Sequence, residues 1–378
     1  MFMGLVLGVT TVFSSIGPAV VTVSAAAAES GVTDSDCTDK STKEPESDKV
    51  VPDANQYKYQ KDELAAFCHF GPNTFNEIEW GEHYGDKKPS EIFTLKDNFD
   101  ADTLVRTLKN AGFKKLIITA KHHDGFCLYP SEYTDFNCEE LGPKRDITGE
   151  LTDAVRSEGL KMGLYYSGLI DWQFANDPIF KEEDNFGNAC PTFEYADYSY
   201  NQMKELVDKY HPSVFWNDIG WPKQSEHMMP YFLAHYYNVV EEGVVNDRFN
   251  GLYHDFSTKE YKQGEANRKE KWEMCRGMGL SFGYNENEGD DQLISVPDLI
   301  HLLVATVSDT ETCFSISVRN QTELFRLSRK NVFLRLENGW RLTEKVFMIP
   351  VVPNIFRKQQ EMVYSCSLQQ KKKIFMYL

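Results

Sequence analysis

Short apolar runs alternate with amphipathic stretches along most of this chain, and this alternation limits the folds open to it. The apolar runs occupy Ala65 to Gly71, Lys115 to Ala120, Met162 to Ser167, Val214 to Asp218 and Val244 to Arg248. The amphipathic stretches between them include Ala101 to Ala111, Asp146 to Glu158 and Tyr198 to Tyr210. Strands that alternate with helices in this way predict an α/β fold, in which crossover helices connect a parallel sheet.

Length and charge narrow the class of protein. The chain has 378 residues, and no long Pro, Gly or Ser linker interrupts residues 55–308, so we expect one catalytic domain there. The formal net charge of −17 would repel nucleic acid and anionic membranes at long range. A neutral substrate fits this charge better, and we expect neither nucleic acid nor membrane as a partner.

The first 54 residues are predicted to lie outside that domain. Residues 1–28 are apolar, carry no charged side chain and end in small residues, which is typical of a cleaved signal peptide. Residues 29–54 are rich in Asp, Ser, Thr and Lys and hold too few large apolar groups to fold, so we expect a disordered linker. The signal peptide predicts a secreted, extracellular protein.

Eight cysteines are present, but their spacing shows no CxxC pair and no zinc pattern. We therefore expect no metal site and no cofactor. Cys68 and Cys127 lie in apolar runs, which predicts buried thiols, although an export route would also permit a disulfide between cysteines.

Polar residues gather where the predicted strands stop. They are His69, His122-His123-Asp124, Tyr165-Tyr166, Asp218 and Arg248. In a (β/α)₈ barrel of the TIM type, the carboxyl ends of the strands form the catalytic mouth. The pattern predicts such a barrel, with these side chains around its mouth.

Asp218 is the most informative of these residues, because it ends an apolar run and lies between Trp216 and Trp221. A carboxylate at a strand end beside indole faces is typical of a site where a sugar ring is bound and cleaved. The alternative interpretation is an aspartate that only caps the following helix.

The histidines also have two interpretations. His69, His122 and His123 could be core histidines that bind backbone carbonyls, or they could bind a ligand. Neighbouring residues of a strand point to opposite faces, so we expect that His122 and His123 do not chelate one ion together. Hydrogen bonding to sugar hydroxyls is the better use for them.

The chain from about Gln60 to Ser308 resembles the α-L-fucosidases of glycoside hydrolase family 29. The resemblance rests on six motifs that follow the order of the family, together with the pair Glu79-Trp80. The motifs are His69-Phe70-Gly71, Lys121 to Phe126 (KHHDGF), Leu164 to Gly168 (LYYSG), Trp216-Asn217-Asp218, Asn246-Asp247-Arg248 and Leu280 to Asn285 (LSFGYN).

This resemblance implies hydrolysis of terminal α-L-fucose from glycans with retention of configuration, Asp218 as the nucleophile and Glu260 as the general acid/base. Glu265, Glu270 and Glu273 follow closely and remain alternatives for the acid/base. The resemblance also implies a set of ligands for the sugar: His69, Glu79, Trp80, His122, His123, Tyr165 or Tyr166, and Arg248. Phe282 and Trp80 would form the apolar wall for the C5 methyl group. The partners would be fucosylated glycans, and the oligomeric state stays open.

The chemistry of a retaining glycosidase fits these residue types. It needs two carboxyl groups roughly 5 Å apart, one ionised to attack and one protonated to donate a proton. Arg248 and the histidines could keep Asp218 ionised, and a loop-borne Glu260 closed against aromatic surface would have a raised pKa. Two rival functions remain: a catalytically inactive carbohydrate-binding barrel, and a related exo-glycosidase such as a galactosidase.

The chain changes character after Ser308. Residues 309–378 carry twelve Lys or Arg and six Asp or Glu, a net +6, so residues 1–308 carry −23. Where the family has a last strand reading about Gly-Asn-Leu-Leu-Leu-Asn-Ile-Gly-Pro, this chain has Asp-Thr-Glu-Thr-Cys-Phe-Ser-Ile-Ser-Val-Arg from Asp309 to Arg319.

A shifted reading frame accounts for this change. Synonymous codons for Asp309 to Arg326, regrouped from the third base, permit Tyr-Gly-Asn-Leu-Leu-Leu-Asn-Ile-Gly-Pro. We therefore predict a frameshift at about Val307 to Asp309 and a non-native tail over residues 309–378. A barrel that lacks its last strand has open edges, so we expect the 378-residue chain with this tail to be insoluble or inactive. The alternative is a genuinely divergent tail.

Overall fold

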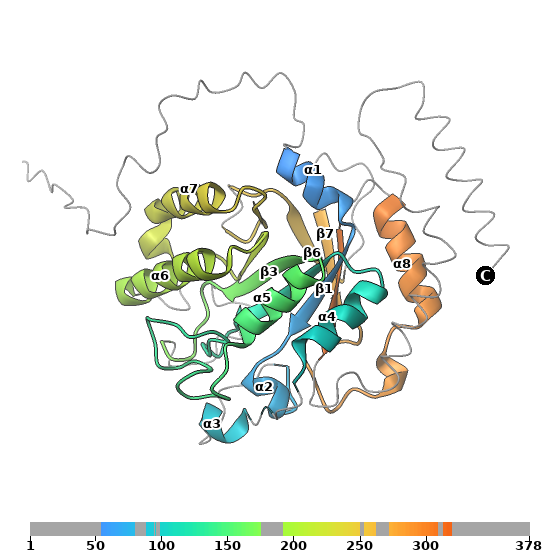
Figure 1. The fold of residues 1–378 in the computed structure, drawn as a ribbon, viewed down its shortest axis with the longest axis horizontal. Helices are drawn as coiled ribbons and strands as arrows, with labels where there is room; N and C mark the ends of the chain where they lie inside the picture. The colour runs from blue at the N-terminus through green and yellow to red at the C-terminus, as the bar shows by residue number, and fades with distance from the viewer. Residues whose placement is uncertain are drawn as a thin grey trace, which may run out of the picture.

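Eight parallel strands form one sheet in the computed structural model of this chain, which describes residues 54–79, 88–93, 95, 99–174, 192–249, 253–261, 272–308 and 313–319 (Figure 1). The strands are β1 Leu64–His69, β2 Lys115–Lys121, β3 Lys161–Ser167, β4 Val214–Asp218, β5 Val244–Val245, β6 Ser257–Glu260, β7 Trp272–Gly277 and β8 Cys313–Arg319. Their order in the sheet is β5-β4-β3-β2-β1-β8-β7-β6. The predicted α/β class with a parallel sheet is confirmed.

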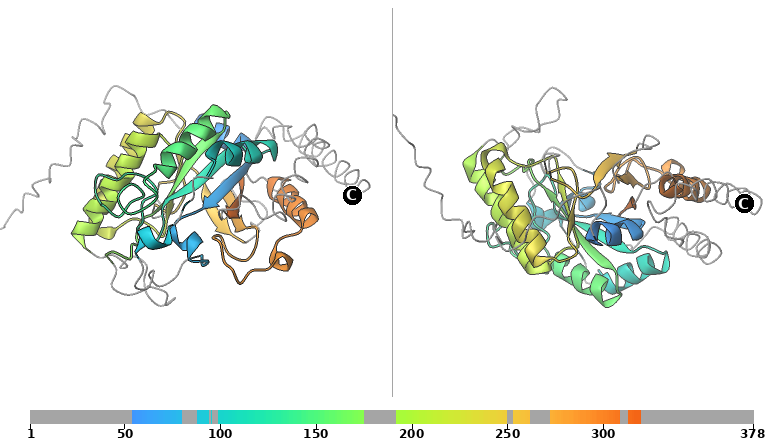
Figure 2. Two further views of the ribbon diagram at one scale, coloured as in Figure 1. Left: turned by 60° about the horizontal axis from the view of Figure 1, so that its bottom comes forward. Right: turned by 90° about the horizontal axis from the view of Figure 1, so that it is seen from above.

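Helices lie around the outside of the strands (Figures 1 and 2). They are α1 Ala54–Lys61, α2 Pro72–Phe75, α3 Pro89–Ile92, α4 Ala101–Asn110, α5 Ile147–Ser157, α6 Phe193–Tyr210, α7 Met229–Val239 and α8 Val296–Ser308, with 3₁₀ turns η2 Lys223–Met228 and η3 Asp290–Gln292. Side-chain caps start three of them, because Asp100, Asp146 and Thr192 accept hydrogen bonds from the first-turn amides of α4, α5 and α6. The three predicted helices are therefore present, and α6 begins five residues earlier than predicted.

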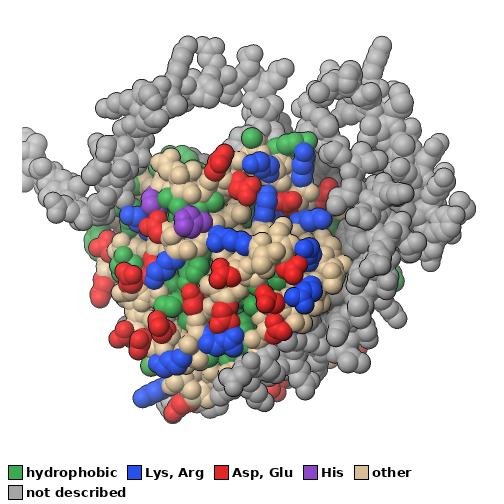
Figure 3. All heavy atoms as spheres, in the orientation of Figure 1, with side chains coloured by type: hydrophobic (Ala, Val, Ile, Leu, Met, Phe, Trp, Pro, Cys, Tyr) green, Lys and Arg blue, Asp and Glu red, His purple; other side chains and the backbone are tan. Residues whose placement is uncertain are grey.

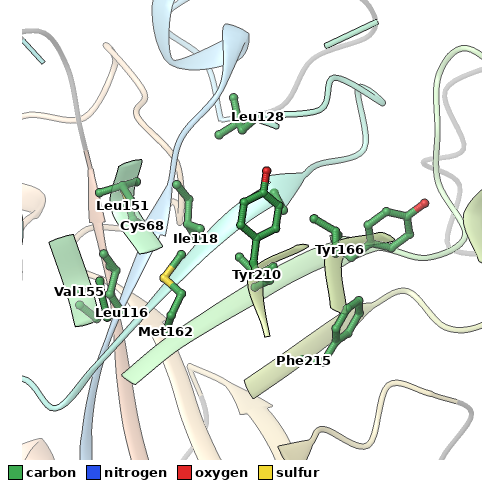
Figure 4. Packing of buried hydrophobic residues seen from close by; sticks show 14 of the residues in the cluster. Cys68, Leu116, Ile118, Leu128, Leu151, Val155, Met162, Tyr166, Tyr210 and Phe215 are labelled. Atoms are coloured by element: carbon green, nitrogen blue, oxygen red, sulfur yellow. The ribbon is translucent and has the colours of Figure 1, made fainter. Parts of the chain in front are cut away.

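The two faces of the sheet bury different side chains. Cys68, Ile118, Tyr166 and Phe215 pack with α5 and the other helices in the larger cluster (Figure 4). Their neighbours in sequence, such as Phe67, Ile117, Tyr165, Val214 and Trp216, form a second cluster on the opposite face, which is also buried. This alternation follows from the two-residue period of a strand. It explains why the strands read as continuous apolar runs, since both faces are covered.

Helix α1 covers one end of this second cluster. Its Tyr59 belongs to that cluster and stacks on Phe256 with ring centroids 4.5 Å apart. The Tyr59 hydroxyl donates to Glu273 Oε2 at 2.5 Å, and Trp216 Nε1 donates to Glu273 Oε1 at 3.1 Å. Because Glu273 begins β7 with Trp272, this polar group lies at the amino end of the strands, away from Asp218.

Strand β8 corrects the prediction that the eighth position of the sheet would be left open. It lies between β1 and β7 and pairs in parallel with both, through six residue pairs with β1 and five with β7. The physical reason is that the ladder is built from backbone N–H and C=O groups, which every residue except proline supplies. Alternating aromatic and β-branched residues, Phe314, Ile316 and Val318, are sufficient to favour a strand there.

The two ends of the sheet also meet. An isolated parallel bridge joins Asn246, directly after β5, to Phe256, directly before β6. Asp255 N donates to Val245 O at 2.9 Å, and Thr258 N donates to Asp247 Oδ1 at 3.0 Å. We call this contact between β5 and β6 the seam, and it is shorter than any of the ladders between neighbouring strands.

Several predictions fall outside the described residues. These are the signal peptide at 1–28, the linker at 29–53 and the tail after Arg319; Ala54, which was predicted as linker, already begins α1. Cys68, Cys127, Cys138 and Cys275 are buried free thiols, so the prediction for Cys68 and Cys127 is confirmed. No helix among the described residues is both long and apolar enough to cross a membrane. On the face shown in Figure 3, acidic and basic side chains are mingled.

Candidate active site

Asp218 ends β4, and the chain turns sharply directly after it. Ile219 has φ 66° and Gly220 has φ 122°, so two consecutive residues adopt left-handed conformations. This region is unfavourable for a β-branched residue such as Ile219, which is held there by packing against Ile170 and Trp172. The turn lets Ile219 N donate to Asp218 Oδ1 at 2.9 Å, so the backbone itself orients the carboxylate.

Arg248 joins Asp218 to Glu260. Its Nη1 donates to Asp218 Oδ1 at 2.5 Å, its Nη2 donates to Glu260 Oε1, and its Nε donates to Thr258 Oγ1 at 3.0 Å. The guanidinium also lies over the ring of Trp216, 4.5 Å from the centroid. One planar cation therefore holds two carboxylates that come from strands six places apart in the sheet order.

Two more side chains reach the other oxygen of Asp218. The Tyr165 hydroxyl donates to Oδ2 at 2.6 Å, and His123 Nε2 lies 4.0 Å from the same atom. Burial by itself would raise the pKa of Asp218, but the attraction of Arg248, with His123 and the Tyr165 hydroxyl, more than offsets this and lowers the pKa. Asp218 is therefore a buried carboxylate that is ionised at neutral pH.

His69, His122 and His123 form one cluster beside Asp218. The ring centroids of His69 and His122 are 4.3 Å apart, and those of His122 and His123 are 4.1 Å apart. Burial lowers the pKa of His123 to about 4 and that of His122 well below its usual value. Both rings are neutral at neutral pH, which leaves Arg248 as the cation that faces Asp218 among the residues the structure describes.

The positions of His122 and His123 correct one prediction. The sequence predicted that they would point to opposite faces, as neighbours in a strand do. Strand β2 ends at Lys121, however, so both residues lie beyond the pleated part of the chain and their rings are neighbours. His123 Nδ1 lies 2.7 Å from Ser167 Oγ, which fixes the ring orientation. Among the described residues, no group of three His, Cys, Asp or Glu side chains is arranged to hold a metal ion.

Glu79 and Phe282 meet at the same end of the sheet. Phe282 N donates to Glu79 Oε1 at 2.9 Å, and a Cβ on Gly283 would lie 2.9 Å from His69 Nδ1 and 3.0 Å from Glu79 Cα. The close backbone approach explains why glycine stands at 283. Trp80, the other residue expected at the apolar wall, lies outside the described residues.

Glu260 ends β6, so the expectation that it lies on a loop is wrong. Its side chain is 43% exposed and paired with Arg248, whereas the sequence predicted a glutamate closed against aromatic surface. Of the alternatives, Glu273 is fully buried at the start of β7 and is occupied by Tyr59 and Trp216. Glu265 and Glu270 lie outside the described residues.

Of the two tyrosine alternatives, Tyr165 lies at Asp218 and Tyr166 does not, and the two tryptophans do not form the expected indole surface beside Asp218. Tyr166 faces the helices, where its hydroxyl donates to Gln202 Oε1 at 2.9 Å, because it alternates with Tyr165 along β3. Trp221 is buried against Phe232 and donates to the carbonyl of Ser225. Trp216 is buried beneath Arg248, so neither indole offers an open platform for a sugar ring.

A buried ion pair that was not predicted from the sequence lies next to the histidines. Lys121 Nζ lies 2.9 Å from Asp171 Oδ2, and both side chains are fully buried. Burial opposes the charge on Lys121, but Asp171 offsets this effect and the pKa of Lys121 is raised. A lysine at the end of the apolar run Leu116 to Ala120 was the signal for such a pair, since a buried charge needs a partner.

Comparisons with known proteins place the chain in a family. The Alpha-L-fucosidase family model matches residues 32–318, which extends beyond Ser308, where the sequence predicted that the resemblance would stop. Human plasma alpha-L-fucosidase is 31% identical over 287 residues, which cover 66% of this chain and 60% of that protein. The alpha-L-fucosidase of Dictyostelium discoideum is 31% identical over 246 residues, or 60% of this chain and 52% of that protein. The chain thus spans about half to three fifths of the length of these curated relatives.

The chain is also similar to an alpha-fucosidase of known structure. The Thermotoga maritima alpha-fucosidase in complex with fucose superposes with a TM-score of 0.71 at 33% sequence identity, over 79% of this chain and 77% of that chain. The family match covers well over half of the sequence, and it contains the Asp218–Arg248–Glu260 arrangement. The chain belongs to the alpha-L-fucosidase family.

Proposed function

We propose that this protein is a retaining exo-α-L-fucosidase that removes terminal α-L-fucose from fucosylated glycans. The observation that carries the proposal is the pair of carboxylates, Asp218 and Glu260, held by one guanidinium. A double displacement needs its two carboxyl groups roughly 5 Å apart, and a shared guanidinium keeps two carboxylates close together. The relatives and the fucose complex of the T. maritima enzyme support the choice of sugar.

In the first step, the ionised Asp218 carboxylate attacks the anomeric carbon while Glu260 gives its proton to the departing glycosidic oxygen. The glycosidic C–O bond breaks and a glycosyl ester of Asp218 forms. In the second step, water attacks the same carbon, Glu260 takes a proton from that water, and Asp218 leaves as a carboxylate. Two inversions release fucose with its original configuration.

The Arg248 contacts suggest how the two carboxyls acquire different roles. A general acid must carry a proton, and a protonated carboxyl gains little from a guanidinium. We propose that substrate entry breaks the Arg248–Glu260 contact and leaves the Arg248–Asp218 contact in place. Glu260 is exposed at the end of β6, so its side chain can move away from the guanidinium. Asp218 is buried, so its contact with Arg248 stays in place.

The sugar would be held by the histidine cluster, Glu79 and Tyr165, with Phe282 beside its C5 methyl group. Neutral imidazoles both donate and accept hydrogen bonds, which suits hydroxyl groups. We further propose that the eight strands close into a (β/α)₈ barrel, which the bridge between Asn246 and Phe256 supports. Secretion is proposed from the apolar, small-residue segment at 1–28.

The nucleophile is tested with the Asp218→Ala variant and an aryl α-L-fucoside. We expect most of the activity to be lost, because the variant lacks the carboxylate that forms the glycosyl ester. Added azide should rescue the variant and give a glycosyl azide of inverted configuration, since one displacement replaces two. Hydrolysis at the parent rate would show that Asp218 is not the nucleophile. A parent that binds fucose but releases no phenol would favour the carbohydrate-binding alternative.

The general acid is tested by comparing two leaving groups in the Glu260→Ala variant. An activated aryl fucoside needs little proton donation, so its hydrolysis should fall far less than that of a natural glycan. Glu273→Gln is the matched control, because Glu273 is buried at the amino end of the strands, away from Asp218. If only Glu265→Ala or Glu270→Ala shows the difference between leaving groups, the acid is one of those residues.

A further inference from the structure

Asn217 lies between Trp216 and Asp218 on β4, and its side chain is fully buried. Because side chains alternate along a strand, it points away from the face that carries Asp218. Its Nδ2 donates two hydrogen bonds, to the carbonyl oxygens of Gly220 and of Arg248, both at 2.9 Å. A single amide group therefore contacts the backbone on both sides of the Asp218–Arg248 ion pair.

The Gly220 carbonyl belongs to the turn that carries Asp218. In this turn Ile219 adopts φ 66°, which a β-branched residue avoids unless other contacts hold it. The same turn places Ile219 N against Asp218 Oδ1. The hydrogen bond from Asn217 to Gly220 thus fixes the backbone that orients the carboxylate.

The Arg248 carbonyl lies beyond the regular part of β5. The ladder between β4 and β5 has only two residue pairs and stops at Phe215 and Val245. Asn246 continues the contact with its side chain: its Oδ1 accepts from Asn217 N at 3.2 Å, and its Nδ2 donates to Asn217 O at 2.8 Å. Two asparagine side chains therefore replace the missing ladder between the two strand ends.

The orientation of the Asn217 amide is fixed by its acceptors. A flipped amide would place Oδ1 against two carbonyl oxygens, which repel it. In the observed orientation Oδ1 has no hydrogen-bond partner among the described residues. The two donated bonds therefore decide how this side chain lies.

We propose that Asn217 is a positioning residue, whose amide ties the turn carrying Asp218 to the backbone of Arg248 and so holds the nucleophile against its guanidinium. The inference rests on the proposed function, in which Asp218 attacks the sugar. Asn217 touches neither Asp218 Oδ1 nor Arg248 Nη1, so it acts through their backbones.

Loss of this tie would change the charge environment of Asp218. Among the described residues, the titratable groups that face Asp218 are Arg248, Tyr165 and His123, and Glu260 is linked to it through Arg248. Of these, Arg248 is the one held by Asn217. When Arg248 moves away, Asp218 binds a proton more readily, so activity should be lost at a higher pH on the acidic side.

The experiment compares Asn217→Leu with a matched control, Asn137→Leu, in the full chain. Asn137 is also buried, donates to the Thr134 carbonyl and accepts from two backbone amides, but it lies in the connection between β2 and α5. We expect Asn217→Leu to lower kcat for an aryl α-L-fucoside by about 10²-fold, with KM within about threefold. The acidic limb of its pH profile should move to higher pH.

The control should lose thermal stability but keep the parent kcat and the parent pH profile. Asn217→Ser retains one hydroxyl donor and should lie between the parent and Asn217→Leu. If Asn217→Leu lowers Tm as the control does while kcat and the acidic limb stay at the parent values, the positioning role is overturned.

A second measurement separates this inference from the proposed function. A ¹³C NMR titration of the carboxyl of Asp218, assigned by its absence in Asp218→Asn, needs no catalytic activity. A parent without fucosidase activity would contradict the proposed function alone. A higher pKa of Asp218 in Asn217→Leu than in Asn137→Leu supports the positioning role, and equal values overturn it.

Discussion

Arg248 decides the charge balance of the site at the scale of single residues. It is the partner of both carboxylates, and their attraction, which outweighs the cost of burial, raises its own pKa. The neutral histidines around it carry no charge that could replace it. An arginine suits this place better than a lysine, because a planar guanidinium can donate to two carboxylates and stack on Trp216 at the same time.

His123 should make the protein sensitive to mild acid. Its pKa is about 4 in the folded chain, against about 6.5 in an unfolded chain. Between these values only the unfolded chain binds the proton, so stability falls as the pH drops from about 6.5 to about 4, by about 3 kcal/mol. His123→Gln should remove this part of the loss. Urea unfolding at pH 7 and pH 4.5 checks it, with the exposed His227→Gln as control, and equal losses in all three proteins would contradict it.

The sequence could predict which types of residue form the site, but it could not always decide between two neighbouring residues of the same type. It placed Asp218, Arg248, Tyr165 and the histidines together because parallel strands end at one edge of a sheet. It could not choose between Tyr165 and Tyr166, since both faces of this sheet are buried and the apolar pattern looks the same on each. Asn217 was missed because its role depends on two carbonyls, which every sequence has.

At the scale of elements, the Lys121–Asp171 ion pair joins the end of β2 to the segment after β3. Removing one partner leaves a buried charge unpaired, so Asp171→Asn should destabilise the fold by about 3 to 5 kcal/mol. Replacing both, as Lys121→Met with Asp171→Leu, should recover most of that loss, because apolar side chains need no partner. Denaturant unfolding of the two variants and the parent measures both effects. A double variant less stable than Asp171→Asn would show that the charges themselves are needed.

Substitutions in β8 test whether this strand stabilises the sheet. Ile316 pairs with Ala66 of β1 and Arg276 of β7, so its backbone lies in the interior of the sheet. Ile316→Pro removes the backbone donor and should cost more than about 3 kcal/mol, whereas Ile316→Val keeps it and should cost about 1 kcal/mol or less. Thermal unfolding distinguishes them. Equal stability of the two variants would mean that β8 does not contribute to the sheet.

The elements themselves were largely predictable, with two physical exceptions. Strand β4 has the predicted bounds, and β1 to β3 differ from the predicted runs by one or two residues, because a long apolar run between two helices strongly favours a buried strand. Strand β5 ends at Val245, three residues before the predicted end at Arg248. Strands β6 and β7 were not predicted, since Ser257–Glu260 and Trp272–Gly277 mix polar and apolar residues. Strand β8 was rejected because its side chains differ from those of the family, although the backbone alone can complete the ladder.

At the scale of the whole molecule, the eighth strand changes what we expect of the solubility and activity of the 378-residue chain. The predicted insolubility or inactivity depended on open edges at β1 and β7, and both edges are paired with β8. The shifted reading frame stays a prediction, and the sequence of the gene across codons 300–315 decides it. Secretion stays a proposal too, which N-terminal sequencing of the exported protein would test.

The seam gives the site a property that no single strand has. Along the ladder, β4 and β6 stand six strands apart, yet their last residues, Asp218 and Glu260, share one arginine. Across the seam the same two residues are only two strands apart, so the few backbone contacts between the ends of β5 and β6 set their spacing. A substitution that loosens these contacts should widen the gap between the two carboxylates while the other ladders stay intact. Turnover in this protein should thus register small displacements at the seam that leave its melting temperature untouched.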